Sequence, residues 1–168
     1  MTILYAVILF VLLQRLGELA LSWHNTRRLL DEGAVEAAPL HYPLLVGMHA
    51  AWLVPLAIWI PPSRAPDLVF LGAFAVLQVG RLWVIVPLGR FWTTRIITLS
   101  GDPLVRRGPY QLLRHPNYVV AAAEIAVLPL AFGAWEVALV FSVVNGILLT
   151  HRVRTENRAF RVRRALAT

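Results

Sequence analysis

The stretch of sequence richest in chemically capable side chains is residues 108–118, which reads GPYQLLRHPNY. Pro116 disfavours a helical backbone at His115, so the pattern predicts a helix that begins near Asn117. The N–H groups of a first helical turn have no partner within the helix and can bind acceptor atoms of a ligand. His115 and the arginine before it add donors, and Tyr118 adds an aromatic face. We expect a ligand pocket here; the alternative is a topology-setting arginine, a proline cap and an interfacial tyrosine.

A second candidate group lies near the C-terminus. Arg152 and Glu156 are four residues apart, so they share one face if this segment is helical. They then place one cation and one anion at the mouth of the pocket. The alternative is an exposed surface pair that contributes about 0.2–0.5 kcal/mol.

Polar side chains also interrupt the apolar segments, where they are costly and usually face a protein interior or a watery cavity. Counted at about 1.5 Å per residue from the segment ends, they fall in one band roughly 8–12 Å below the membrane interface. The band predicts a polar cavity, and the alternative is separate packing pairs such as Arg81 with Glu124. Its members are Arg15, Glu18, His49, Arg81, Glu124 and Asn145.

Several other chemistries are poorly supported. The chain has no cysteine, which excludes disulfides, thiolate metal sites and cysteine nucleophiles. It has no P-loop and no G-x-G-x-x-G motif, and its five histidines form no H-x-x-x-H pair, so we expect no metal site. Its serines lack a nucleophile-elbow motif.

The composition indicates a membrane protein. Of the 168 residues, 58% are apolar and 15% are charged, whereas soluble domains are about 45–50% apolar with about 25% charged residues. The mean hydropathy is +0.66. The net charge of +7 comes from arginines that lie between apolar runs, which is typical of membrane topology and not of a nucleic-acid-binding surface.

Five apolar segments approach the roughly 20 residues that a spanning helix needs. We therefore expect a single all-α membrane domain over residues 1–168. Its parts are three N-terminal spans in 1–88, a cytoplasmic cofactor-binding loop at 89–118, a helical hairpin at 119–151 and a cytoplasmic C-terminal segment at 152–168. The five expected spans are 2–23, 43–60, 67–88, 119–133 and 136–151.

The distribution of arginine predicts the orientation. Thirteen arginines lie in segments 24–42, 89–118 and 151–168, against Arg64 alone on the other side. The positive-inside bias makes those three segments cytoplasmic, with the N-terminus outside and the C-terminus inside. We expect a bacterial inner or plasma membrane protein whose active site faces the cytoplasm.

The motif Gly-Pro-Tyr-x-x-Leu-Arg-His-Pro-x-Tyr, followed about 35 residues later by Arg-x-x-x-Glu, resembles the isoprenylcysteine carboxyl methyltransferase family over about residues 90–160. The resemblance implies an integral membrane enzyme that moves a methyl group from S-adenosylmethionine to a lipid-like acceptor. It implies that Arg152 faces the substrate and that Glu156 is the acidic cofactor ligand. The other cofactor contacts that it implies are Arg95, Asp102, Pro103, Leu104, Val105, Tyr110, His115, Pro116, Asn117 and Tyr118.

The N-terminal half is similar to a bacterial branch of that family, whose members are thought to O-methylate alkylpyrones or related polyketide lipids. The similarity rests on short motifs: Arg15-x-x-Glu18, Asn25, His41-Tyr42-Pro43, His49 and Glu124. The chain departs from the family pattern at two places. In the tail, Asn157 follows Glu156, whereas the family often has consecutive acidic residues. In residues 101–105, only the Leu-Val end matches the better-known eukaryotic members.

Methyl transfer to oxygen predicts roles for three residues. An ionised acceptor, such as a carboxylate or acidic enol, needs no base, and Arg152 would hold it. A less acidic phenol would give its proton to Glu124 or His49. The expected partners are a prenyl or polyketide lipid acceptor and membrane lipid, and no nucleic acid. The alternatives are a phospholipid N-methyltransferase, a sterol-type reductase, whose members are about twice this size, and a scaffold without catalysis.

Overall fold

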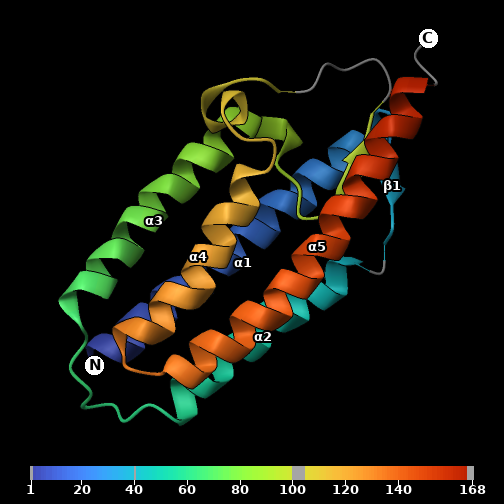
Figure 1. Ribbon diagram of the computed structural model, residues 1–168. Coiled ribbons are helices and arrows are strands. Elements are labelled where there is room, and N and C mark those ends of the chain that lie inside the picture. Colours follow the sequence, from blue (N-terminus) through green and yellow to red (C-terminus); the bar gives the residue numbers. More distant parts are fainter. Residues whose placement is uncertain (1, 40, 100–104, 166–168) are drawn as a thin grey trace.

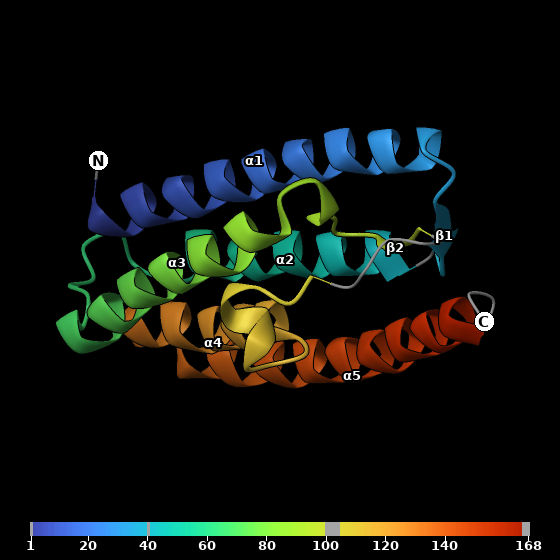
Figure 2. The same cartoon turned by 90° about the horizontal axis from the view of Figure 1, so that it is seen from above.

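The computed structural model describes residues 2–39, 41–99 and 105–165, and helices dominate it (Figure 1). The helices run along one common direction, with α1 on one side and α4 and α5 on the other (Figure 2). The expected all-α architecture is confirmed. The helices are α1 (Ile3–Asp31), α2 (His41–Ile58), α3 (Leu68–Leu88), α4 (Pro116–Ala131) and α5 (Trp135–Ala165).

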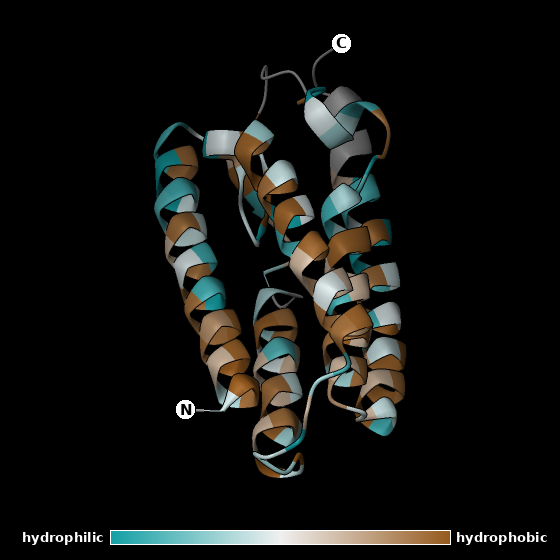
Figure 3. Cartoon of the chain, turned by 90° about the vertical axis from the view of Figure 1, so that its left-hand side faces the viewer, coloured by the Kyte–Doolittle hydropathy of each residue, from teal (hydrophilic) through white to brown (hydrophobic). Residues whose placement is uncertain are grey.

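The apolar character of the helices supports a membrane protein. Ile3–Asp31, Leu68–Phe91 and Trp135–Ala159 are long and apolar enough to cross a membrane, whereas Tyr42–Ile58 and Pro116–Ala131 are apolar but shorter. Many large apolar residues of the helices are exposed, and in Figure 3 α1 turns from hydrophobic near the N-terminus to hydrophilic toward its other end. Five spans and their orientation stay predictions.

Two helices extend beyond their expected ends. We expected the first and last spans to end at residues 23 and 151, and the helices continue past these points to Asp31 and Ala165. Hydropathy falls where a chain leaves the membrane, whereas a helix continues until a residue disfavours it. The first glycine or proline after residue 23 is Gly33, whose φ is +89°, and residues 151–168 contain neither.

The predicted hairpin and the predicted start of its first helix are confirmed. The helix α4 begins at Pro116, one residue from the expected position, and a short turn joins α4 to α5. Gly133 lies in that turn with φ +72°, a conformation that glycine adopts without a steric penalty. The turn therefore returns α5 antiparallel to α4, alongside which it packs.

The segment between α3 and α4 holds more regular structure than its sequence predicts. It contains two short 3-10 helices, η1 (Gly89–Phe91) and η2 (Gly108–Gln111), and the strand β2 (Ile96–Thr98). This strand pairs antiparallel with β1 (Val35–Ala37), with Glu36 opposite Ile97. Strands of three residues are too short to show the alternation by which a strand is recognised.

The apolar core draws side chains from all five helices. It lies toward the end of the bundle where the N-terminus is found, whereas residues 89–99 and 105–115 cross the opposite end (Figure 1). The core therefore fixes the helices at one end and leaves the other end for a site. Its most deeply buried members include Leu4, Val11, Trp52, Phe74, Ile125, Leu128 and Val137.

Candidate functional site

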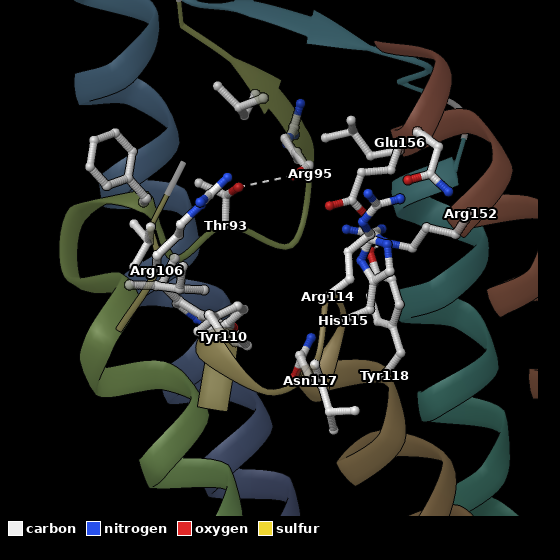
Figure 4. A pocket seen from close by; sticks show the side chains of 18 of the residues that line it. Thr93, Arg95, Arg106, Tyr110, Arg114, His115, Asn117, Tyr118, Arg152 and Glu156 are labelled. Carbon is white, nitrogen blue, oxygen red and sulfur yellow. Dashed lines mark hydrogen bonds and ion pairs between the residues drawn. The ribbon is translucent and has the colours of Figure 1, made fainter. Parts of the chain in front are cut away.

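A cavity of about 650 Å³ lies at the end of the bundle that residues 89–99 and 105–115 cross. Its size is within the range of about 300–1,000 Å³ that small-molecule sites occupy. Figure 4 shows the labelled side chains arranged around an open centre, with Arg106 and Tyr110 on one side and Tyr118, Arg152 and Glu156 on the other. Of the residues predicted for the site, those that line the cavity are Arg95, Val105, Tyr110, His115, Asn117, Tyr118, Arg152 and Glu156.

The start of α4 positions the aromatic part of this wall. Pro116 is the first helical residue and is buried, so the chain enters the helix directly after His115. The His115 ring stacks on the Tyr118 ring, with centroids 5.2 Å apart and planes 12° apart. The three-residue spacing places both rings on one side of the first turn.

Tyr118 links the two tail residues. Its hydroxyl donates to Glu156 Oε2 and accepts a hydrogen bond of 2.7 Å from Arg152 Nε. His115 Nδ1 lies 3.8 Å from the same carboxylate. The predicted shared face of Arg152 and Glu156 is therefore present, and a tyrosine from α4 joins them in place of a direct ion pair.

Arg152 is a buried cation with one donor group left open. Its side chain is 6% exposed, and its Nη2 donates to the carbonyl of Thr94 at 2.8 Å. Its Nη1 is buried and has no hydrogen-bond partner among the described residues. No ion pair joins this guanidinium to a carboxylate within the part of the chain that the structure describes.

Three further buried atoms of cavity-lining residues lack partners in the described residues. They are Trp92 Nε1, His115 Nε2 and Asn117 Oδ1. Buried polar groups are nearly always hydrogen-bonded, so such atoms gathered around a cavity indicate a ligand with matching polar groups. Together with the Glu156 carboxylate they offer both donors and acceptors, as a zwitterionic nucleoside such as S-adenosylmethionine requires.

Tyr110 lies on the facing side of the cavity (Figure 4). Burial, and secondarily the negative charge of Glu156, raises the pKa of the Tyr110 hydroxyl above its ordinary value of 10.0. The phenol is therefore neutral across the physiological pH range and can donate a hydrogen bond.

Arg95 lines the cavity, and its guanidinium is bound by Glu36 and Tyr42. It forms a 2.9 Å ion pair with Glu36 and lies 4.6 Å from the centroid of the Tyr42 ring. The predicted contact with a cofactor therefore involves an arginine that already has partners. Asp102, Pro103 and Leu104, also predicted for the cofactor pocket, lie outside the described residues.

Two predicted catalytic residues lie away from the cavity wall. Glu124 is 0% exposed in the middle of α4, and His49 binds the carbonyl of Leu45 in its own helix through Nδ1 at 2.8 Å. Neither lines the cavity. Sequence spacing predicted that both residues lie in the protein interior, but it did not determine which interior space they face.

Glu124 belongs to a buried ionic cluster, which we define as Arg15, Glu18, Gln78, Arg81 and Glu124. Arg81 bridges the two acids, with Nη2 2.7 Å from Glu18 and Nη1 2.7 Å from Glu124. Arg15 also contacts both acids, at 3.0 and 2.6 Å, and Gln78 donates to Glu124 at 3.0 Å. The pair of Arg81 with Glu124, given above as the alternative to a polar cavity, thus exists as part of one cluster that joins α1, α3 and α4.

Sequence reasoning named Asn25 as a motif residue but assigned no role at the site to Asn25, Ser22 or Thr94. Thr94 acts through its backbone carbonyl, which carries no side-chain signal. Ser22 and Asn25 lie four and seven residues after Glu18, and this helical spacing predicts a polar face that continues the buried band. That spacing was the one signal in the sequence from which the role of Ser22 and Asn25 could have been inferred.

Comparison with known proteins gives two matches. The isoprenylcysteine carboxyl methyltransferase (ICMT) family matches residues 69–162. An uncharacterized protein of Bacillus subtilis (strain 168), YpbQ, is 34% identical over 159 residues, which cover 92% of this chain and 95% of that protein. No solved structure matches significantly. The chain therefore belongs to the isoprenylcysteine carboxyl methyltransferase family, a family of membrane methyltransferases.

Proposed function

We propose that this protein transfers a methyl group from S-adenosylmethionine to an oxygen atom of a lipophilic acceptor. The observation that carries the proposal is the cavity wall: four buried polar atoms without partners among the described residues and a carboxylate, in a member of a methyltransferase family. Members of this family generally use S-adenosylmethionine, which supplies an electrophilic methyl group on a sulfonium.

The residues around Glu156 are the proposed cofactor site. Glu156 supplies an acceptor for the donor groups of the cofactor, and His115 Nε2 and Asn117 Oδ1 supply the open polar atoms beside it. Tyr118 holds the Glu156 carboxylate in place, and Tyr110 offers a neutral hydroxyl from the other side. These residues bind and orient the cofactor and exclude water from it.

Arg152 is the proposed binding group for the acceptor. A buried cation without a carboxylate partner is costly, and an oxyanion that binds Nη1 would relieve this cost. A guanidinium also matches the planar shape of a carboxylate or enolate. Transfer between aligned partners in a dry site proceeds without a strong base when the acceptor is already ionised. The proposal therefore assigns no proton transfer to Glu124 or His49.

The positive charge of Arg152 favours oxygen over nitrogen as the atom that accepts the methyl group. An amine must lose its proton before it can accept a methyl group, and the Arg152 cation repels the product, which carries a positive charge. A carboxylate or enolate acceptor instead becomes neutral on methylation. A phospholipid N-methyltransferase is thus the weaker alternative.

The membrane arrangement is part of the same proposal. Five spans with the N-terminus outside place the cavity and the arginine-rich segments at the cytoplasmic face of a bacterial inner membrane. The cofactor would then enter from the cytoplasm and a prenyl or polyketide lipid from the bilayer.

A labelling experiment tests the proposal. The purified protein in lipid nanodiscs is mixed with methyl-labelled S-adenosylmethionine and a bacterial lipid extract, and the labelled product is analysed by mass spectrometry. We expect the label on an oxygen, as a methyl ester or enol ether. A label on nitrogen, or no transfer by folded protein to any lipid, contradicts the proposal.

A further inference from the structure

The face of α1 that points into the protein is polar over its C-terminal half. Four of its buried residues, Leu4, Val11, Glu18 and Asn25, recur at seven-residue intervals and change from apolar to polar along the helix. The other buried residues are Ser22, Thr26 and Leu29. Ser22 is 2% exposed and Asn25 is 5% exposed. Burying a polar group is unfavourable unless it is hydrogen-bonded, so we expect these side chains to have hydrogen-bond partners in the interior.

Ser22 and Asn25 both bind the segment that follows α3. The Asn25 amide donates to the carbonyls of Gly89 and Trp92 at 3.1 and 2.9 Å. The Ser22 hydroxyl accepts from the backbone N–H of Thr94 at 2.8 Å and lies 2.7 Å from the Thr94 hydroxyl. In Figure 2 the turn after α3 lies against α1, in agreement with these contacts. Two side chains of α1 therefore fix the backbone from residue 89 to 94.

The same backbone fixes the guanidinium of Arg152. The Thr94 residue whose N–H binds Ser22 gives its carbonyl to Arg152 Nη2. With the bond from Nε to the Tyr118 hydroxyl, two bonds on different nitrogens define the plane of the guanidinium. Nη1 is then the nitrogen left for a ligand.

We propose that Ser22, supported by Asn25, is a positioning residue for Arg152 and acts through Thr94. A methyl acceptor held by Arg152 must be aligned within a fraction of an ångström, so the carbonyl that orients the guanidinium has to be fixed in turn. Ser22 touches neither the cavity nor Arg152 and lies outside the 69–162 region that matches the family. The part that concerns the acceptor rests on the proposed function, whereas the positioning of Arg152 does not.

The test is the side-chain NMR signal of Arg152 in the full-length protein in lipid nanodiscs, with ¹⁵N-labelled arginine. The Nε–H resonance is identified by its loss in Arg152→Lys. In Ser22→Ala the Thr94 carbonyl is no longer fixed, so the guanidinium that it orients through Nη2 also loses the alignment of its Nε–H with the Tyr118 hydroxyl. We expect solvent exchange of this N–H to rise about tenfold, the size that loss of one supporting hydrogen bond predicts. Thr94→Val keeps the backbone bond to Ser22, so we expect a smaller rise.

Thr26→Val is the matched control. Thr26 is buried on the same helix, 5% exposed, and its hydroxyl has no hydrogen-bond partner among the described residues. We expect no change in the Arg152 signal. The proposal is overturned if Ser22→Ala leaves the signal unchanged in folded protein, or if Thr26→Val changes it equally. If Ser22→Ala does not fold, the Thr94→Val variant is the deciding test. The proposal is then overturned if solvent exchange of the Arg152 N–H in Thr94→Val is no faster than in Thr26→Val.

The design separates the two proposals. The NMR measurement uses protein without cofactor or acceptor, so absence of methyl transfer in the wild type counts against the proposed function and leaves this inference intact. If the wild type is active and the proposal holds, Ser22→Ala lowers the rate of methyl transfer and leaves the affinity for S-adenosylmethionine unchanged.

Discussion

The buried ionic cluster and the cavity are both polar, yet their groups are paired to different extents. In the cluster, Arg81 and Arg15 each contact both Glu18 and Glu124. In the cavity wall, Arg152 has no acidic partner among the described residues, and its Nη1 is one of four buried polar atoms of lining residues without a hydrogen bond. The cluster also has two such atoms, Arg15 Nε and Gln78 Oε1, so the difference lies in the charges. A cluster whose charges are already neutralised serves to join helices, whereas a wall with an unpaired cation is suited to bind an anionic ligand group. Burial of charge alone does not distinguish a site from a structural contact.

The first prediction tests whether the ionic cluster is structural. Arg81→Met leaves two buried carboxylates with one arginine, and breaking a buried ion pair costs about 3–5 kcal/mol of unfolding free energy. We expect a large fall in the thermal unfolding midpoint in detergent. Arg28→Ala, which removes an ion pair with a 60% exposed arginine, is the control and is expected to cost at most about 1 kcal/mol. Equal losses in the two variants would refute a structural cluster.

The second prediction tests whether the open arginine is functional. Arg152→Ala is expected to lower methyl transfer by about 100-fold, the loss typical of an electrostatic catalytic contact, with S-adenosylmethionine binding retained. The assay is the labelled methyl transfer. Arg154→Ala changes an exposed arginine on the same helix and should leave the rate intact. Loss of cofactor binding in Arg152→Ala would contradict this role and show that Arg152 binds the cofactor.

The third prediction concerns the link between the two tail residues. Tyr118→Phe keeps the ring that stacks on His115 but removes the hydroxyl that binds Glu156 and Arg152. Hydrogen bonds to charged groups contribute about 1.5–3 kcal/mol, so we expect cofactor affinity to fall at least about tenfold by calorimetry. Tyr5→Phe, at an exposed position, is the control. Unchanged affinity in Tyr118→Phe would show that the hydroxyl does not organise the site.

The smallest expected effect is the pH dependence that Tyr110 gives to stability. Because burial raises the pKa of Tyr110 in the folded protein, the phenol ionises more readily in the unfolded chain. Its contribution to stability is present below about pH 10 and is lost as pH rises beyond that value. Between pH 9 and pH 11 the unfolding midpoint of Tyr110→Phe should therefore fall less than that of the wild type. An equal fall would show that Tyr110 is not buried as described.

The sequence predicted much of the fold because membrane helices carry strong local signals. Apolar length located the helices, and Pro116 located the start of α4 to within one residue. The ends of α1 and α5 were misplaced because hydropathy marks the membrane boundary and not the end of a helix. The β1–β2 ribbon was missed because its pairing joins residues about 60 positions apart in the sequence.

The site was predictable where side chains carry the chemistry. The motif around His115 and the spacing of Arg152 and Glu156 located one wall of the cavity. The sequence could not show that Glu124 pairs with Arg15 and Arg81, because three helices contribute to that contact and their rotation about their axes is set by packing. The role of the Thr94 carbonyl could not be predicted, because every residue has a backbone carbonyl and the sequence does not show which one binds Arg152.

Binding of S-adenosylmethionine tests the central claim most directly. Calorimetry on purified, folded wild-type protein in detergent is compared with Tyr118→Ala and Glu156→Ala, and with Glu136→Ala as a control at an exposed position near the other end of α5. We predict binding by the wild type and Glu136→Ala, and its loss in the two cavity variants. Absence of binding by the wild type, or equal binding by all four proteins, would contradict the account and leave the family fold without the proposed chemistry.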